Sequence, residues 1–178
     1  MSQLKVNSIV PVGGLPSGSN GGIIQCKQTF KSDTTSISNT TSRADISGMS
    51  VTITPSSSAN KILIISSLVI GLPGGEYPFA CYLMRGSTDI GKGTSASGSR
   101  INVTMGMMSD DSSSHAYPPM CFHFLDSPAT TSATTYKWQW QHTRHTNQEA
   151  YLNRPVSDQD ENYNLRASST ITAFEITT

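Results

Sequence analysis

The stretch KILIISSLVI, residues 61–70, decides the fold class of this chain. Successive side chains of an extended strand point to opposite faces of its sheet. Both faces of this stretch are apolar, one carrying Ile62, Ile64, Leu68 and Ile70 and the other Leu63, Ile65 and Val69. A strand with one face in water would instead alternate apolar and polar residues. Residues 60–71 are therefore predicted to form a strand that is covered on both sides.

A second stretch, FACYLM at residues 79–84, has the same property. Its two alternating sets are Phe79, Cys81 and Leu83 on one face and Ala80, Tyr82 and Met84 on the other. A β-sandwich of this size has a single interior, which covers only one face of each strand. We expect another copy of the chain to supply the second cover of strands 60–71 and 78–86, so the sequence predicts a homo-oligomer.

The rest of the chain from Gly22 onward is patterned as short strands. Runs rich in Ile, Val, Thr and aromatic residues are separated by Ser, Gly, Asp and Pro clusters, which are typical of turns. Further strands are predicted at 22–31, 49–54, 99–108, 117–126, 133–142, 148–153 and 168–177. The sequence therefore predicts an all-β fold, an antiparallel β-sandwich or jelly-roll-like head domain over residues 22–178.

Local signals refine this fold. The sequence Arg85-Gly86-Ser87-Thr88 predicts a tight turn between two strands, in which Gly86 adopts a positive φ. The sequence Asp126-Ser127-Pro128 predicts the end of a strand. A strand near the C-terminus, 168–177, is expected to close a sheet and protect its edge.

The first 21 residues, MSQLKVNSIVPVGGLPSGSNG, differ from the rest. Their prolines and glycines indicate an extended N-terminal arm with a flexible tether. A disordered tail is the alternative. We favour an anchoring arm that docks on a partner, because it carries apolar residues that a simple linker would not need: Leu4, Val6, Ile9 and Val12.

Composition excludes several classes of partner. The formal net charge is zero, and only 13% of residues are charged, whereas 48 of the 178 are serine or threonine. A nucleic-acid binder would need a basic face, so no nucleic-acid partner is expected. The longest apolar stretch, 62–72, is far shorter than the roughly 20 residues of a membrane span, so no membrane insertion is expected. The N-terminus shows no signal peptide, which predicts a soluble protein made in a cytoplasm.

Motifs for catalysis or for cofactor binding are absent from the sequence, so we expect no enzyme, no catalytic residue and no cofactor. No metal site is expected either. The strongest oxygen-ligand cluster, Asp158, Asp160 and Asn162, lacks the glycine and distal glutamate of a calcium loop and is interpreted as a solvated acidic loop. A ring of His123 side chains on a three-fold axis is a weaker alternative. The three cysteines, Cys26, Cys81 and Cys121, are predicted to be buried thiols in strands.

Residues 133–142 place Tyr136, Trp138 and Trp140 on one face of a strand. These aromatic side chains fill the core or an interface, or they form a platform for stacking on a sugar ring. The sequence leaves both open, with Trp140 expected to be the more exposed ring.

Four stretches resemble a repertoire found in virion proteins of marine tailed phages, of the cyanophage or pelagiphage kind. They are SVTITPSSSANKILIISSLVIG (50–71), LMRGSTDIGKG (83–93), FLDSPATTSATTYKWQWQ (124–141) and NYNLRASSTITAFEI (162–176). The opening LKVNSI is similar to the N-terminal segments of such proteins. The resemblance implies a β-rich, trimeric tail-fibre or related virion structural protein. A fibre shaft would need repeats or heptads, which are absent, and this favours a short adaptor, a tip or a capsid decoration protein.

The expected function is therefore that of a virion protein, anchored by its arm to other tail or capsid proteins and projecting an oligomeric head. A stand-alone, lectin-like carbohydrate-binding module is the alternative. Contact with a host surface glycan is compatible with both interpretations, through loops 109–119, 142–149 and 155–162. The residues expected to make that contact are Tyr117, His142, Arg144 and Asp160.

Overall fold

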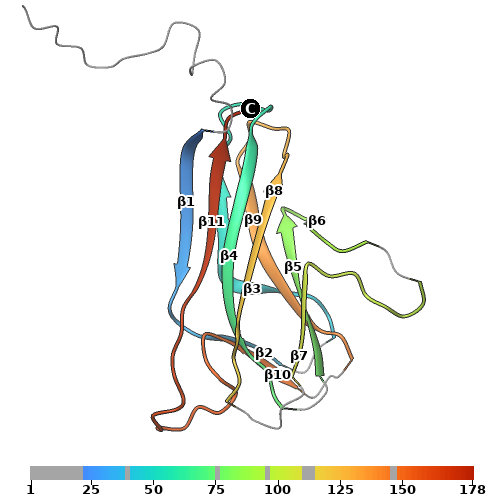
Figure 1. The fold of residues 1–178 in the computed structure, drawn as a ribbon, viewed down its shortest axis with the longest axis vertical. Helices are drawn as coiled ribbons and strands as arrows, with labels where there is room; N and C mark the ends of the chain where they lie inside the picture. The colour runs from blue at the N-terminus through green and yellow to red at the C-terminus, as the bar shows by residue number, and fades with distance from the viewer. Residues whose placement is uncertain (1–21, 39–40, 75–76, 95–96, 110–114, 145–147) are drawn as a thin grey trace, which may run out of the picture.

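A computed structural model describes residues 22–178, except for 39–40, 75–76, 95–96, 110–114 and 145–147. Within these residues the chain forms strands and no helix (Figure 1). The strands are β1 (Ile23–Lys31), β2 (Thr35–Ser38), β3 (Ala44–Ile53), β4 (Lys61–Gly71), β5 (Tyr77–Arg85), β6 (Thr88–Ile90), β7 (Met105–Ser109), β8 (Pro119–Asp126), β9 (Thr134–His142), β10 (Glu149–Leu152) and β11 (Ser169–Ile176).

The strands of the described residues make two antiparallel sheets that face each other. In the first sheet β1, β11, β4 and β8 lie side by side. At one end of this sheet, β10 pairs with the last two residues of β4, and β2 pairs with β10. The second sheet has the order β3-β9-β5, and the free side of β5 pairs with β7 along one half and with β6 along the other. In Figure 1 the first sheet lies toward the viewer and the second lies behind it. The predicted antiparallel β-sandwich is therefore confirmed.

All nine predicted strands are present, with shifted ends. The prediction over 99–108 was too long, because β7 begins only at Met105. The sequence analysis missed β2 and β6, which have four and three residues. The predicted turn after β5 is confirmed: Gly86 has a φ of 59°, and Arg85 pairs directly with Thr88.

The expectation that the C-terminal strand protects a sheet edge was wrong. β11 pairs with β1 on one side and with β4 on the other, so it is an interior strand. The edge beside it is formed by β1. The predicted arm, residues 1–21, lies outside the described residues, so its boundary with the head domain remains a prediction.

The core lies between the two sheets and is tied together by polar contacts. Trp138 of β9 donates its indole N–H to Ser66 Oγ of β4 at 2.8 Å, which links the two layers. Tyr136 donates its hydroxyl to the buried carboxylate of Asp126 at 2.7 Å. Arg85 pairs with the same carboxylate at 2.9 Å. Burial and the neighbouring Asp126 carboxylate raise the pKa of Tyr136, so its hydroxyl stays a donor.

A second buried carboxylate holds one end of the first sheet. Glu175 of β11 points inward and accepts hydrogen bonds from the Ser56 N–H at 2.6 Å and from Asn60 Nδ2 at 2.6 Å. Burial by itself would raise the pKa of Glu175, but the hydrogen bonds from Asn60 and Ser56 outweigh it and lower the pKa. The turn between β3 and β4 is therefore fixed to the C-terminal strand by a charged acceptor.

Candidate functional site

The two strands predicted to need a second cover differ in how much of it the chain itself supplies. On β5 the second face is formed by Ala80, Tyr82 and Met84, which we call the β5 outer face. All three are buried within the single chain, Tyr82 to 3% exposure, and Val103 packs against them. Another subunit is therefore not needed here, and the prediction for strand 78–86 was wrong in this respect.

Arg43 completes the cover of the β5 outer face. Its guanidinium carbon lies 3.7 Å from the centroid of the Tyr82 ring, a cation–π arrangement. Asp89 accepts hydrogen bonds from Arg43 and from Lys92, and this holds the guanidinium in place. The same hydrogen bonds lower the pKa of Asp89 below its ordinary value.

Backbone contacts pin the segment that carries Val103. The N–H of Thr104 donates to the Cys81 carbonyl at 3.1 Å, and the Thr104 hydroxyl accepts from the Leu83 N–H at 3.0 Å. The cover of β5 is thus part of the fold rather than a loosely attached loop.

On β4 the chain covers the second face only in part: Val69 is buried, whereas Ile65 is exposed and Leu63 is half-buried. The register places three rows of side chains across β1, β11, β4 and β8, which together we call the β4 outer face. The rows are Cys26–Phe174–Leu63–Leu125, Gln28–Thr172–Ile65–His123 and Phe30–Thr170–Ser67–Cys121. At its centre Ile65 is 46% exposed, and at its two edges Phe30 and Leu125 are 62% and 48% exposed.

The β4 outer face carries no Asp, Glu, Lys or Arg in these three rows. Four strands about 4.8 Å apart, with about six residues each at about 3.3 Å per residue, make a surface of roughly 400 Å². The largest apolar patch on an ordinary soluble monomer is about 300–600 Å² and is often functional, so a partly apolar face of this size is compatible with an interaction site. Depletion of charge is also the compositional mark of the centre of a protein interface.

Two of the three thiols, those of Cys26 and Cys121, lie on the β4 outer face. Cys81 faces the core, and burial raises its pKa strongly, as expected for an inert buried thiol. Cys26 and Cys121 are exposed, so the prediction of three buried thiols was wrong for these two. They lie in strands as predicted, but on the side of the sheet that faces away from the core.

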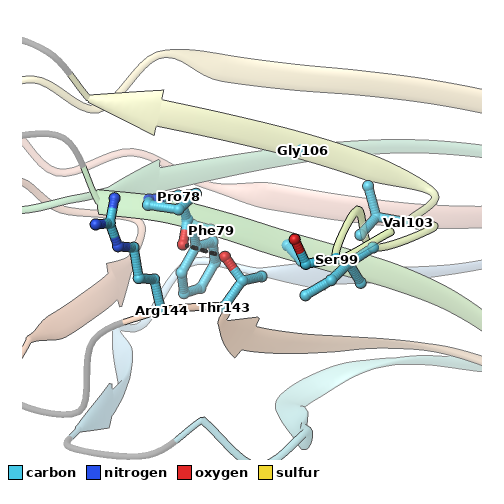
Figure 2. A pocket seen from close by; sticks show the side chains of 9 residues that line it. Pro78, Phe79, Ser99, Val103, Gly106, Thr143 and Arg144 are labelled. Carbon is cyan, nitrogen blue, oxygen red and sulfur yellow. Dashed lines mark hydrogen bonds between the residues drawn. The ribbon is translucent and has the colours of Figure 1, made fainter. Parts of the chain in front are cut away.

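A pocket of about 480 Å³ opens on the sheet opposite the β4 outer face, next to the β5 outer face. Residues of β5, of β7, of the segment before β7 and of the chain just after β9 line it, as Figure 2 shows. The lining residues are Pro78, Phe79, Ala80, Ser99, Ile101, Val103, Gly106, Thr143 and Arg144. Arg144 is the charged residue of this set, which is otherwise apolar or hydroxyl-bearing. The sequence analysis had not brought Ser99, Ile101 and Val103 together with Arg144, because no local pattern joins them.

The structure scatters the four predicted host-contact residues. Arg144 and Asp160 are exposed and Tyr117 is partly exposed, each in a connection between strands. His142 is 1% exposed at the end of β9, and its ring lies 4.9 Å from that of Phe79. We therefore withdraw His142, because a side chain with so little exposed surface does not meet a ligand from solution.

The loops before β8 and before β11 do come together. The rings of His115 and Tyr163 meet edge to face, with their centroids 4.9 Å apart. Asp158 is paired with Arg166 and lies 3.7 Å from Arg154 Nε, and the Arg166 hydrogen bond lowers its pKa. The carboxylate of Asp158, which the sequence analysis considered as a calcium ligand, is therefore paired with arginine. Across the described part of the chain, no group of three or more His, Cys, Asp or Glu side chains could hold a metal ion.

The aromatic face of β9 belongs to the core. Tyr136, Trp138 and Trp140 are all buried between the sheets, so they offer no platform for a sugar. The expectation that Trp140 is the exposed ring was wrong, because it packs against Phe79 with ring centroids 6.0 Å apart. Among the described residues, no helix is long and apolar enough to cross a membrane.

Comparison with solved structures finds partial likeness to viral proteins. A structure of infectious bursal disease virus Gx strain matches 98% of this chain and 43% of its own, at 13% identity and a TM-score of 0.44. The VP2 subviral particle of infectious bursal disease virus matches 86% of this chain and 38% of its own, at 14% identity and 0.38. The tripod from the baseplate of bacteriophage Tuc2009 matches 99% and 74%, at 9% identity and 0.22.

The chain spans less than half of the length of the two bursal-disease-virus chains. All three TM-scores lie below one half, so these likenesses carry no conclusion about function. No family model and no curated protein matches the sequence.

Proposed function

We propose that this chain is a structural protein of a bacteriophage particle, and that its head assembles with copies of itself through the β4 outer face. The observation that carries the proposal is the set of three uncharged rows across β1, β11, β4 and β8. Their exposed apolar side chains lose contact with water when a second copy covers them, which favours association. The sequence resemblance to phage tail-fibre and related virion proteins supports the particle as the place of assembly.

The proposed oligomer is a homotrimer, as the same resemblance implies. A specific interface buries about 800 Å² on each partner, roughly twice the area of the β4 outer face. The edges of the sheet would have to contribute the remainder, which suits an arrangement in which each chain meets two neighbours.

The exposed thiols give this proposal a direct test. Cys26 and Cys121 lie on the β4 outer face, and Cys81 lies in the core as an internal control. Alkylation followed by mass spectrometry should leave all three thiols unmodified in the assembled protein. An Ile65→Asp variant, with a charge at the centre of the face, should label at Cys26 and Cys121 but not at Cys81. Rapid labelling of both thiols in the concentrated wild type would contradict assembly through this face.

Attachment to the particle is assigned to the arm and involves no catalysis by this chain. A triple variant Leu4→Asp, Val6→Asp and Ile9→Asp removes three of the four apolar side chains assigned to the arm and leaves the head sequence intact. Purified variant protein should keep its oligomeric mass, yet particles assembled with it should lack the chain. Normal incorporation of the variant would show that another part of the chain makes the attachment.

Contact with the host is the last part of the proposal. It uses the connections that hold Tyr117, Arg144 and Asp160, which are at least partly exposed. Replacing these three residues with alanine should leave folding and incorporation unchanged and should weaken adsorption of the particles to host cells. Unchanged adsorption would assign host contact to another protein of the particle.

A further inference from the structure

The pocket beside Arg144 has the size and the chemistry of a small-ligand site. Its volume of about 480 Å³ lies within the range of roughly 300–1,000 Å³ that such sites occupy. It is partly open to solvent, so one unit of a longer chain could enter it. Its floor is the start of β5, and the segment before β7 forms one wall, which the backbone hydrogen bond from Thr104 to Cys81 ties to β5 at its Val103 end.

Arg144 determines the sign of the ligand's charge. It is exposed, it is the charged residue of the lining, and it forms no ion pair with a carboxylate of the described residues. Figure 2 shows its side chain rising beside Pro78 at one end of the pocket. The planar fork of a guanidinium matches the paired oxygens of a carboxylate or a phosphate, so an anionic group is the favoured partner.

The remaining lining favours a sugar ring as the body of the ligand. Hydroxyl groups of Ser99 and Thr143 stand among apolar surfaces of Ala80, Ile101 and Val103. The Thr143 hydroxyl donates to the Pro78 carbonyl at 3.1 Å, so its oxygen is held in place and keeps acceptor capacity. A sugar ring presents apolar C–H faces and hydroxyl groups together, which matches this mixture. A fatty or aromatic acid would make no hydrogen bond to the Thr143 oxygen or to the exposed Ser99 hydroxyl, so it would use less of this lining than a sugar does.

We propose that this pocket binds an acidic sugar unit, with the ligand's carboxylate on Arg144 and its ring between the Ile101–Val103 wall and β5. The inference names the ligand class for the host-contact part of the proposed function and rests on that part. It does not depend on assembly through the β4 outer face, which lies on the opposite sheet.

The direct experiment is a titration of the full-length protein followed by amide NMR. The probes are methyl glucuronide, methyl glucoside and inorganic phosphate, and the reporters are the amides of Ala80, Gly106 and Thr143. The glucuronide should shift these amides saturably, with a Kd at least tenfold below that of the glucoside. Equal affinity for the glucoside, tighter binding of phosphate at the same amides, or no shift with any probe would each overturn the proposal.

Two variants locate the site, and a third is the control. Arg144→Gln should raise the Kd for methyl glucuronide at least tenfold. Gly106→Val should abolish binding by filling the pocket. A Cβ on Gly106 would lie 3.4 Å from Val103 Cγ2 and 3.9 Å from the Phe79 carbonyl oxygen, so the Cβ itself makes ordinary contacts. Thermal unfolding of the variant checks that the two further methyl groups of valine leave the fold intact. Arg100→Gln is the matched control, because Arg100 hydrogen-bonds within its own loop to the Ser97 carbonyl and does not line the pocket.

Arg100→Gln should leave the Kd unchanged. An equal loss of affinity in both arginine variants would mean that general positive charge, rather than this pocket, attracts the ligand, and this would also overturn the proposal. Adsorption assays distinguish failure of the ligand class from failure of host contact. Suppose that particles with Arg144→Gln adsorb poorly to host cells, but that the purified protein does not bind acidic sugars. The proposal of an acidic sugar as ligand would then be wrong, and the proposal of host contact would be retained.

Discussion

β4 and β5 are equally apolar on their two faces, yet their second faces meet different environments. The β5 outer face is covered by Val103 and Arg43 of the same chain, and Tyr82 is almost fully buried. The β4 outer face stays exposed, and its central residue Ile65 has nearly half of its surface in water. The alternation pattern shows that a strand needs cover on both sides, but it does not show which part of which chain provides it.

The source of the cover determines how each face contributes to stability. A cover supplied by the same chain adds to the free energy of unfolding at any protein concentration. A cover supplied by another copy adds only where copies associate, so its contribution rises with protein concentration.

The largest expected effect is that of Tyr82→Ala on the covered face. Removing a buried aromatic ring should lower the free energy of unfolding by about 3 kcal/mol. Urea unfolding at two protein concentrations should give the same loss at both, because the cover is intramolecular. The matched variant Ile65→Ala should give a loss that grows with protein concentration. If the loss of unfolding free energy for Tyr82→Ala depended on protein concentration, a subunit contact would lie on the β5 outer face, and this would contradict the intramolecular cover.

A smaller effect is expected of Glu175→Gln, on the inner side of the sheet that carries the β4 outer face. Loss of the charged acceptor for Ser56 and Asn60 should cost about 1–2 kcal/mol at neutral pH. The pKa of Glu175 is lowered in the folded state, so its contribution is present above the ordinary value of 4.5 and is lost as the pH falls through the folded value. Urea unfolding over a pH series should show the difference between the wild type and the variant shrinking below pH 4.5. A constant difference would contradict the assigned hydrogen bonds.

Gly86→Ala tests the turn at the end of β5 and should cost about 1 kcal/mol, because Gly86 has a φ of 59°. Gly93→Ala is the control, since Gly93 lacks a positive φ and an added Cβ would meet only the Val103 carbonyl oxygen at 4.0 Å. Thermal unfolding should separate the two variants, and neither should change the oligomeric mass. Equal stability of both variants would show that the turn does not require glycine.

Local signals predicted the strands well and the contacts between distant segments poorly. Alternation alone located β4, β5 and β9, and the Arg85–Thr88 turn follows from one glycine. β2 and β6 were missed because three or four residues are too few to show a period. The central position of β11 was missed because strand order depends on pairing across more than 100 residues.

The sites show the same limit. Arg144 was selected from its loop composition, but the pocket exists because Val103 and Gly106 come to it from another part of the chain. Cys26 and Cys121 were expected to be buried because each lies in an apolar or alternating run. Only the register shows that they fall in the exposed rows. His142 was selected as a loop residue, yet it ends β9 and faces inward.

The most direct test of assembly through the β4 outer face is the mass in solution of Ile65→Asp compared with the wild type. Light scattering should give three times the 19.1 kDa chain for the wild type and a single, folded 19.1 kDa chain for the variant. The isolated variant chain should lose about 1–2 kcal/mol of stability, because Ile65 is half exposed and Asp is disfavoured in a central strand. Leu165→Asp, which changes an exposed leucine outside this face, should keep the wild-type mass. A monomeric wild type, or an Ile65→Asp variant with the full oligomeric mass, would contradict assembly through this face.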